Sequence, residues 1–201
     1  MPAAREALLD AALSALSTQP WATVRMVDVA SAAGVSRQTL YNEFGSKDGL
    51  ARALVRRAAD GYLAGVERAL ESPGGAGDRL AATAAWTVRA ARTNTLVRAL
   101  LTGCWGERLP RPARLSGPPS SPVPAQRRAD AGPPTPAELL GLVRDRAVAA
   151  LDGGRPPHDP ALTVTCEIAL RLALSYAVAA SSVPTDAAPL VREVVERWPA
   201  G

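Results

Sequence analysis

The chain is poor in the residues from which catalytic and metal-binding sites are usually built. Its 201 residues include one histidine and two cysteines, and Cys104 and Cys166 lack the spacing of a metal site. The sequence shows neither a nucleophile paired with a base nor a glycine-rich phosphate loop. We therefore expect a protein that is not an enzyme and has no catalytic residue, metal or cofactor. His158 is predicted to be an exposed loop residue, and both cysteines are predicted to be small buried apolar residues.

Aromatic residues and long apolar runs are scarce as well. Aromatics make up 4% of the chain, and no uninterrupted apolar run approaches the ~18 residues that a membrane-spanning helix needs. No secretory signal precedes the first predicted helix. Alanine, leucine, arginine and valine dominate instead, and this composition favours helix. The sequence thus predicts a helical, cytoplasmic protein that does not engage a membrane.

The most informative segment, residues 24–50, predicts two short helices joined by a glycine turn. Apolar residues at three- and four-residue spacing predict a helix from Arg25 to Ala33. Gly34 can end this helix in a left-handed conformation, and Ser36 is a good N-cap for a second helix. Two short helices in this arrangement are typical of a DNA-binding helix-turn-helix.

The second helix is predicted to bury one face and to present polar side chains on the other. Leu40 and Phe44 are four residues apart and would face inward. The outward residues are of the types that contact base edges and phosphates. Ser46 would cap the next helix with Lys47 in its first turn, where a phosphate is favoured. The candidate DNA-contacting residues are Arg25, Ser36, Arg37, Gln38, Thr39, Tyr41, Asn42 and Lys47.

These residues resemble TetR-family transcriptional regulators. The matching pieces are Ala33-Gly34-Val35-Ser36, Thr39-Leu40-Tyr41, Phe44 and Gly45-Ser46-Lys47. Asn42 and Glu43 replace the aromatic residue and the histidine that are common in that family. Glu43 matters most, because a carboxylate near phosphates is repulsive unless it accepts a hydrogen bond from cytosine N4 or turns away. The close match covers about a quarter of the chain.

The resemblance implies an all-α, TetR-like fold with two domains. A three-helix helix-turn-helix domain would occupy residues 1–46, and a helical effector-binding and dimerisation domain would occupy residues 47–201. The function implied is that of a DNA-binding transcriptional regulator, a ligand-responsive repressor that binds a palindromic operator in double-stranded DNA as a homodimer. The sequence identifies neither the small-molecule effector nor the operator.

Helical spacing predicts the elements outside the motif. The expected helices are Arg5–Ser17, one from Ser46 to before Ser72, Asp78–Arg92, Asn94–Thr102, one from Pro136 through Leu151, Ala161–Ser181 and a last one containing Leu190 and Trp198. In the resembled family, the fourth helix and those after it enclose an effector pocket. The candidate ligand-binding residues are Tyr62, Trp86, Arg89, Thr93 and Trp105. The alternative is that these aromatics are ordinary core residues.

Residues 103–135 are rich in proline and are predicted to be a loop or a disordered segment. Such a segment is either a cover over a pocket or an insertion without that role. Its arginines would allow a second nucleic-acid contact, although solvated disorder explains them as well.

The last two predicted helices carry apolar stripes, and Glu167 and Arg171 on the first of them form an i,i+4 pair. In the resembled family the last helices form a four-helix bundle across a twofold axis, so we expect a homodimer through these two helices. The alternative is that both stripes are buried within one monomer. A dimer would place two recognition helices ~34 Å apart, which suits a palindromic operator.

The distribution of charge leaves a second function open. The chain has a net charge of +4, but residues 1–72 contain eight Arg and Lys and eight Asp and Glu. Residues 1–72, which contain the predicted DNA-binding domain, therefore have no net charge. The prediction of DNA binding depends instead on whether Arg25, Arg37 and Lys47 lie on the surface that would face DNA. The alternative function is a helical protein-interaction module without sequence-specific DNA binding. A steep loss of affinity with added salt would distinguish DNA binding from that alternative.

Overall fold

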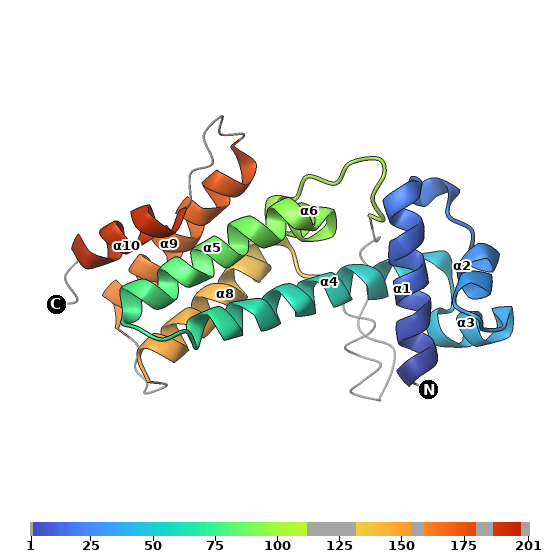
Figure 1. The fold of residues 1–201 in the computed structure, drawn as a ribbon, viewed down its shortest axis with the longest axis horizontal. Coiled ribbons are helices and arrows are strands. Elements are labelled where there is room, and N and C mark those ends of the chain that lie inside the picture. The colour runs from blue at the N-terminus through green and yellow to red at the C-terminus, as the bar shows by residue number, and fades with distance from the viewer. Residues whose placement is uncertain (1, 112–131, 154–158, 180–186, 198–201) are drawn as a thin grey trace. The chain divides into compact units, whose positions relative to one another are not determined.

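The computed structural model describes residues 2–111, 132–153, 159–179 and 187–197, and every regular element in these ranges is helical (Figure 1). The elements are α1 (Pro2–Thr18), the 3₁₀ turn η1 (Trp21–Thr23), α2 (Met26–Ala32), α3 (Arg37–Phe44), α4 (Lys47–Leu70), α5 (Ala76–Thr93), α6 (Thr95–Thr102), α8 (Pro136–Leu151), α9 (Pro160–Val178) and α10 (Ala187–Arg197). The predicted all-α fold class is therefore confirmed. His158, Trp198 and the centre of the proline-rich segment, residues 112–131, lie outside the described ranges.

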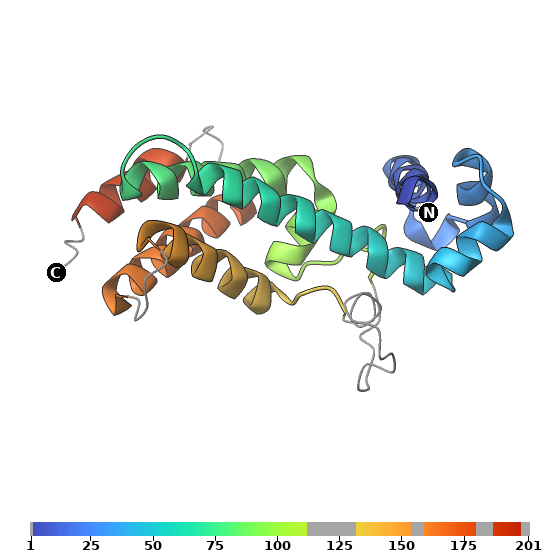
Figure 2. The same cartoon turned by 90° about the horizontal axis from the view of Figure 1, so that it is seen from below.

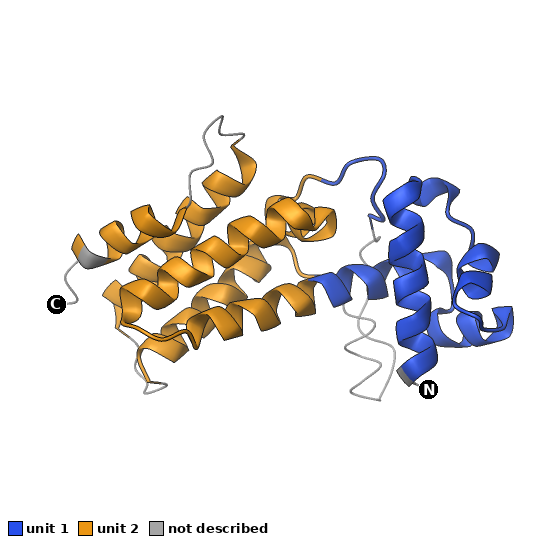
Figure 3. Ribbon diagram, viewed as in Figure 1, with its two compact units in different colours: residues 1–58, 105–133 blue, residues 59–104, 134–201 orange. Residues whose placement is uncertain are grey.

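The chain divides into two compact units (Figure 3). The first contains residues 1–58 and 105–133, and the second contains residues 59–104 and 134–201. The division thus falls inside α4, which is one continuous helix, and not at its start near residue 46. The first turns of α4 belong with the N-terminal helices because Leu50 and Leu54 are buried there.

The core of the first unit forms where α1 lies beside α2 and α3, an arrangement that can be followed in two views (Figures 1 and 2). Leu8 of α1 and Leu40 of α3 are fully buried. Trp21 in η1 is buried too, and its backbone N–H donates to the Arg108 carbonyl at 2.9 Å. Residues on both sides of the proline-rich segment are thus tied to this unit, since Arg56 also donates to the Gly132 carbonyl at 3.1 Å.

The second unit is built around α5, which packs against α6, α9 and α10. Its apolar residues are buried along most of the helix, as at Leu80 and Val88. Cys166 of α9 is also buried, and burial raises the pKa of its thiol to about 12. Cys104 is exposed, however, so the prediction that both cysteines are buried was wrong for this one. Cys104 lies beyond the end of α6, where the apolar face of that helix no longer covers it.

A close helix contact joins α4 to α5 in the second unit. The indole of Trp86 lies against the backbone at Gly65, where a Cβ atom would collide with the ring. The indole N–H also donates to the Tyr62 carbonyl at 3.0 Å. Glycine at residue 65 therefore allows a large aromatic side chain to pack directly on the α4 backbone.

Candidate nucleic-acid interface

The turn between α2 and α3 has the geometry that the sequence predicts. Gly34 has φ +66°, a left-handed conformation that glycine adopts without steric cost. The Val35 N–H then donates to the Ala30 carbonyl at 3.0 Å, and the Ser36 hydroxyl accepts from the Thr39 N–H at 3.0 Å. The predicted N-cap is thus confirmed, and it fixes the direction in which α3 leaves the turn.

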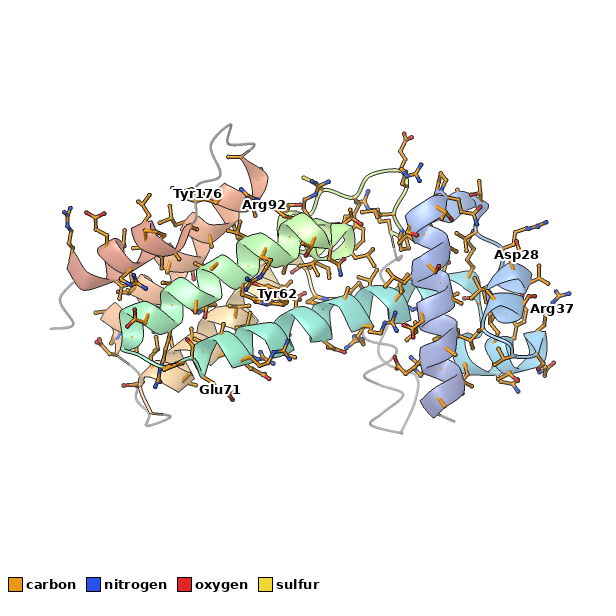
Figure 4. All side chains as sticks on the ribbon, viewed as in Figure 1. Asp28, Arg37, Tyr62, Glu71, Arg92 and Tyr176 are labelled. Atoms are coloured by element: carbon orange, nitrogen blue, oxygen red, sulfur yellow. The ribbon has the colours of Figure 1, made fainter. Side chains whose placement is uncertain are left out.

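The two faces of α3 differ in burial as expected. Leu40 is fully buried and Phe44 is 8% exposed, so this stripe anchors α3 to the core. The exposed residues of the other face are Arg37, Gln38, Tyr41 and Asn42, with Thr39 half-buried beside them. Figure 4 shows Arg37 projecting into solvent. An exposed polar face on a short helix held by a glycine turn is able to enter a DNA major groove.

Hydrogen bonds on this face hold several polar groups in place. The Gln38 amide donates to the Asn42 side-chain oxygen at 2.8 Å, and the Ser36 and Thr39 hydroxyls are 2.9 Å apart. The bond between the amides leaves the Gln38 carbonyl oxygen as an acceptor and the Asn42 amide as a donor. Amide groups of this kind bond to base edges. Among the described residues, none forms a hydrogen bond or an ion pair with the Arg37 side chain, so its guanidinium is available for a phosphate or a guanine.

The junction of α3 and α4 is tight. Gly45 ends α3 with φ +70°, and the Ser46 hydroxyl accepts from the Gly49 N–H at 3.1 Å. A Cβ atom at Gly49 would collide with the Phe44 carbonyl group. The end of α3 is therefore packed directly on the first turn of α4.

Lys47 and Arg25 both have partners within the protein. The Lys47 ammonium donates to the Ala22 carbonyl at 3.0 Å and lies 5.5 Å from the centre of the Trp21 ring. Desolvation lowers its pKa. Arg25 is paired with Asp28 at 2.8 Å. The sequence suggests only phosphate contacts for these two cations, and it gives no sign that Lys47 also fastens η1 to α4.

Glu43, the residue that departs from the common family pattern, is held on the α1 side of α3. Its carboxylate lies 3.6 Å from the Arg5 guanidinium, and its side chain is 23% exposed. The Arg5 guanidinium also donates to the Glu43 backbone carbonyl at 3.5 Å and stacks 4.7 Å from the centre of the Phe44 ring. Sequence reasoning missed Arg5, because 38 residues separate it from Glu43 and no local pattern joins them.

Both acidic residues of α1 form ion pairs as well. Arg57 of α4 lies 2.6 Å from Asp10 and 3.3 Å from Glu6. Together with the pairs at Asp28 and Glu43, these contacts neutralise acids around the first unit. Its overall neutrality therefore does not prevent a local positive charge at α3, where Arg37 lies.

The candidate effector residues are only partly brought together. The Tyr62 hydroxyl lies 3.0 Å from the Thr87 hydroxyl inside the second unit, and burial raises the Tyr62 pKa to about 12 (Figure 4). Trp86 contacts Tyr62 as described above, and the Arg89 guanidinium stacks 5.6 Å from the centre of an indole ring of Trp86. Thr93 is exposed on the next turn of α5 and donates to the Arg89 carbonyl at 2.9 Å.

Trp105 belongs to the first unit and is half-buried in the segment that follows α6. Sequence reasoning did not include Thr87, because a threonine within an alanine-rich helix gives no sign of a buried partner. The hydroxyl of Thr87 is nonetheless the contact that satisfies the phenol of Tyr62 in the core.

Comparison with protein families gives a match at the N-terminus. Residues 8–54 match the model described as "Bacterial regulatory proteins, tetR family". This range begins within α1, contains the α2–α3 motif and ends within α4.

Two curated relatives are similar to about a third of the chain. The HTH-type transcriptional regulator AlkX of Mycobacterium tuberculosis is 46% identical over 68 residues, which are 34% of this chain and 32% of that protein. The HTH-type transcriptional repressor LfrR of Mycolicibacterium smegmatis is 42% identical over 65 residues, which are 32% of this chain and 33% of that protein. The matches thus span about a third of the length of each relative.

The structural similarity extends much further along the chain. The crystal structure of the TetR family repressor AlkX from Dietzia sp. matches with a TM-score of 0.53 and 24% identity. The match covers 94% of this chain and 92% of that one. The fold is therefore shared over nearly the whole length, including the second unit.

Proposed function

We propose that the chain is a member of the TetR family of bacterial regulatory proteins, whose model matches residues 8–54, and that it is a ligand-responsive repressor that binds a palindromic operator as a dimer. The observation that carries the proposal is the exposed polar face of α3, held by the Ser36-capped turn. The repressor role is supported by the name of the relative LfrR, which is 42% identical to this chain over 65 residues.

In this proposal α3 enters the major groove. Arg37, Gln38 and Asn42 contact base edges, because guanidinium and amide groups pair with guanine and adenine there. Tyr41 and the hydroxyls at the start of α3 bond to phosphates, which fix the register of the helix on the duplex. The residues proposed to contact DNA are Arg25, Ser36, Arg37, Gln38, Thr39, Tyr41, Asn42 and Lys47.

The proposed dimer forms through α9 and α10. Val164 and Val178 of α9 are 48% and 65% exposed, and Leu190 of α10 is 41% exposed. Apolar side chains gathered on an exposed surface are typical of a protein–protein interface. A second copy of the chain would cover them and would place two α3 helices on the two halves of an operator.

The composition of α9 also fits a membrane span, since its mean hydropathy over an 18-residue window is 1.5. Glu167 and Arg171 interrupt this run and form an ion pair of 2.7 Å on its surface. A polar pair of this kind suits an interface between soluble subunits better than the centre of a bilayer. We therefore propose a cytoplasmic dimer and not a membrane protein.

The effector is proposed to bind in the second unit near Tyr62, Trp86, Arg89 and Thr93. Trp105, which lies in the first unit, stays a prediction from the sequence. The supporting observation is that α4 carries Tyr62 and Gly65 in the second unit and begins at the junction with α3 in the first. A ligand that displaces Trp86 from Gly65 would act on the same helix that supports α3. By linkage, such a ligand would weaken DNA binding by the factor by which DNA weakens ligand binding.

The test of DNA binding is fluorescence anisotropy with duplexes tiled from the region upstream of the gene, over a salt series. Wild type is expected to prefer one near-palindromic duplex, and its affinity should fall steeply with salt. Arg37→Ala should weaken binding by ~1–3 kcal/mol and relax specificity at one position. The matched control is Arg68→Ala, which removes another exposed arginine from the second unit.

The alternative is a protein-interaction module, favoured by the equal numbers of acidic and basic residues in residues 1–72. A wild-type protein that prefers no duplex and whose binding does not respond to salt would favour this alternative over the repressor.

The dimer has a separate test. Val164→Asp should shift the sedimentation coefficient from dimer to monomer, because a carboxylate would be buried in the interface. The control is Ala76→Asp, at an exposed residue in the first turn of α5, where an acidic side chain is favourable. A Val164→Asp protein that remains dimeric would rule out this surface of α9.

A further inference from the structure

Three contacts from Arg5 converge on the last turn of α3. Its guanidinium lies 3.6 Å from the Glu43 carboxylate, donates to the Glu43 carbonyl at 3.5 Å and stacks 4.7 Å from the Phe44 ring centre. Two of these contacts hold the backbone and the buried anchor of α3, while the third holds a charged side chain. A single arginine of α1 thus fixes the end of the recognition helix in three ways.

The position of Glu43 on α3 explains why its charge needs a partner. Successive residues of a helix are about 100° apart, so Glu43 lies between the buried stripe of Leu40 and Phe44 and the exposed face that contains Asn42. Without Arg5 the carboxylate would be held less firmly on the α1 side, and it has rotamers that turn it toward that exposed face. Any phosphate met by the exposed face would then repel it.

We propose that Arg5 is a positioning residue for DNA binding, which holds the Glu43 carboxylate against α1 and away from the phosphates. The inference rests on the proposed function of α3. Arg5 need not contact DNA in this mechanism, because it acts through Glu43 and through the orientation of the last turn. The pair is partly exposed, so it adds little to folding stability, and its effect appears when DNA brings phosphates close.

The test is a double-mutant cycle in which affinity for the preferred duplex is measured with the full chain. Arg5→Ala should weaken binding roughly tenfold, in keeping with the cost of a like-charge contact across an interface. Glu43→Gln alone should bind at least as tightly as wild type. The double variant Arg5→Ala/Glu43→Gln should recover to within about twofold of Glu43→Gln, since the repulsive charge is gone.

Two further variants separate charge from structure. Arg5→Lys keeps the positive charge but loses the planar stacking on Phe44, so its affinity should lie between those of wild type and Arg5→Ala. Arg57→Ala removes an arginine that also pairs with carboxylates of the first unit, but those carboxylates are on α1. It should weaken binding less than Arg5→Ala does. Circular dichroism melts of each variant check that the helices remain folded.

The outcomes are distinct. A double variant that binds as weakly as Arg5→Ala overturns the inference, because Arg5 would then contact a phosphate itself or serve only the fold. A wild-type protein that prefers no duplex overturns the proposed function and this inference with it. Rescue by Glu43→Gln supports both, since neither loss of a phosphate contact nor general unfolding would be reversed by removing a negative charge.

Discussion

The two units differ in what they leave on their surfaces. In the first unit the exposed face of α3 is polar, and the surrounding acids are held by Arg5, Arg25 and Arg57. In the second unit the exposed residues of α9 include Val164 and Val178, the two most exposed large apolar side chains among the described residues. The first surface suits a polyanion and the second suits another apolar surface, so the two surfaces that we propose as interfaces differ in their chemistry.

The units also use glycine differently along the same helix, α4. At Gly49 the obstacle to a side chain is the backbone carbonyl of Phe44, which cannot move unless α3 moves. At Gly65 the obstacle is the Trp86 side chain, which can rotate. The contact in the first unit is therefore rigid and the contact in the second unit is adaptable, as expected if α3 is a fixed DNA-contacting helix and the second unit responds to a ligand, as we propose.

The largest effect is expected for Gly49→Ala. The new methyl group should force α3 from α4 and destabilise the first unit by about 3 kcal/mol, at the upper end for overpacking. Hydrogen–deuterium exchange should rise in peptides from α3 and remain unchanged in peptides from α5. The control is Gly61→Ala on exposed α4, which meets open space and should stabilise the helix by about 1 kcal/mol. Equal hydrogen–deuterium exchange of the α3 peptides in Gly49→Ala and Gly61→Ala would show that the junction of α3 and α4 is not rigid.

The next largest effect is a loss of stability of the second unit at high pH, when Tyr62 ionises. Burial raises the pKa of Tyr62 from 10.0 to about 12, so the neutral phenol stabilises the fold. This contribution is fully present below pH 10 and is lost as the pH rises through 12, which amounts to about 3 kcal/mol. Denaturant melts of wild type should lose stability over this range more steeply than melts of Tyr62→Phe. Parallel pH profiles for the two proteins would show that the phenol does not contribute in this way.

Gly65→Ala should destabilise the second unit by a smaller amount, about 1–2 kcal/mol, because the Trp86 ring can move aside. The displaced indole should lose its hydrogen bond to the Tyr62 carbonyl. Hydrogen–deuterium exchange should rise in peptides from α5 and remain unchanged in peptides from α3. Gly61→Ala again serves as the control, one turn earlier on the same helix. An effect as large as that of Gly49→Ala would remove the distinction between a rigid and an adaptable contact.

The smallest effects are expected at two helix caps, one in each unit. Ser36→Ala and Asn94→Ala each remove a side-chain acceptor for backbone N–H groups, at the starts of α3 and α6, and each should cost about 1 kcal/mol. Only Ser36→Ala should also weaken operator binding measured by anisotropy, since it alone acts on α3, the helix proposed to contact DNA. A similar loss of binding in Asn94→Ala would mean that the caps act through overall stability.

Local signals predicted the helices and their ends well. The sequence places a cap at Ser36, and its hydroxyl accepts the expected backbone hydrogen bond. Asn94, where the sequence predicts that a helix begins, likewise accepts from the Leu96 N–H. Such caps depend on residues within three positions of one another, so they can be read without knowledge of the fold. The ion pair between Glu167 and Arg171 is predicted for the same reason. DNA contacts and effector contacts remain predictions.

Contacts between distant residues could not be predicted in this way. Lys47 lies 25 residues from Ala22, and its spacing suggests a free cation, whereas it bonds to that carbonyl. The division of the chain inside α4 likewise depends on burial at Leu50 and Leu54, which a continuous helical pattern does not reveal. The exposure of Cys104 depends on how the chain leaves α6, and not on the residue itself.

The sequence by itself determined the helices, the glycine turn and the polar face of α3, because these follow from backbone conformation and from residues one or two turns apart. Only the tertiary structure decided where Glu43 points. The sequence allows its carboxylate to face outward or to turn away, and in the structure the carboxylate lies beside Arg5, which α1 brings to the end of α3 across 38 residues of chain. Charge interactions depend on distance in space, and distance in space is set by packing.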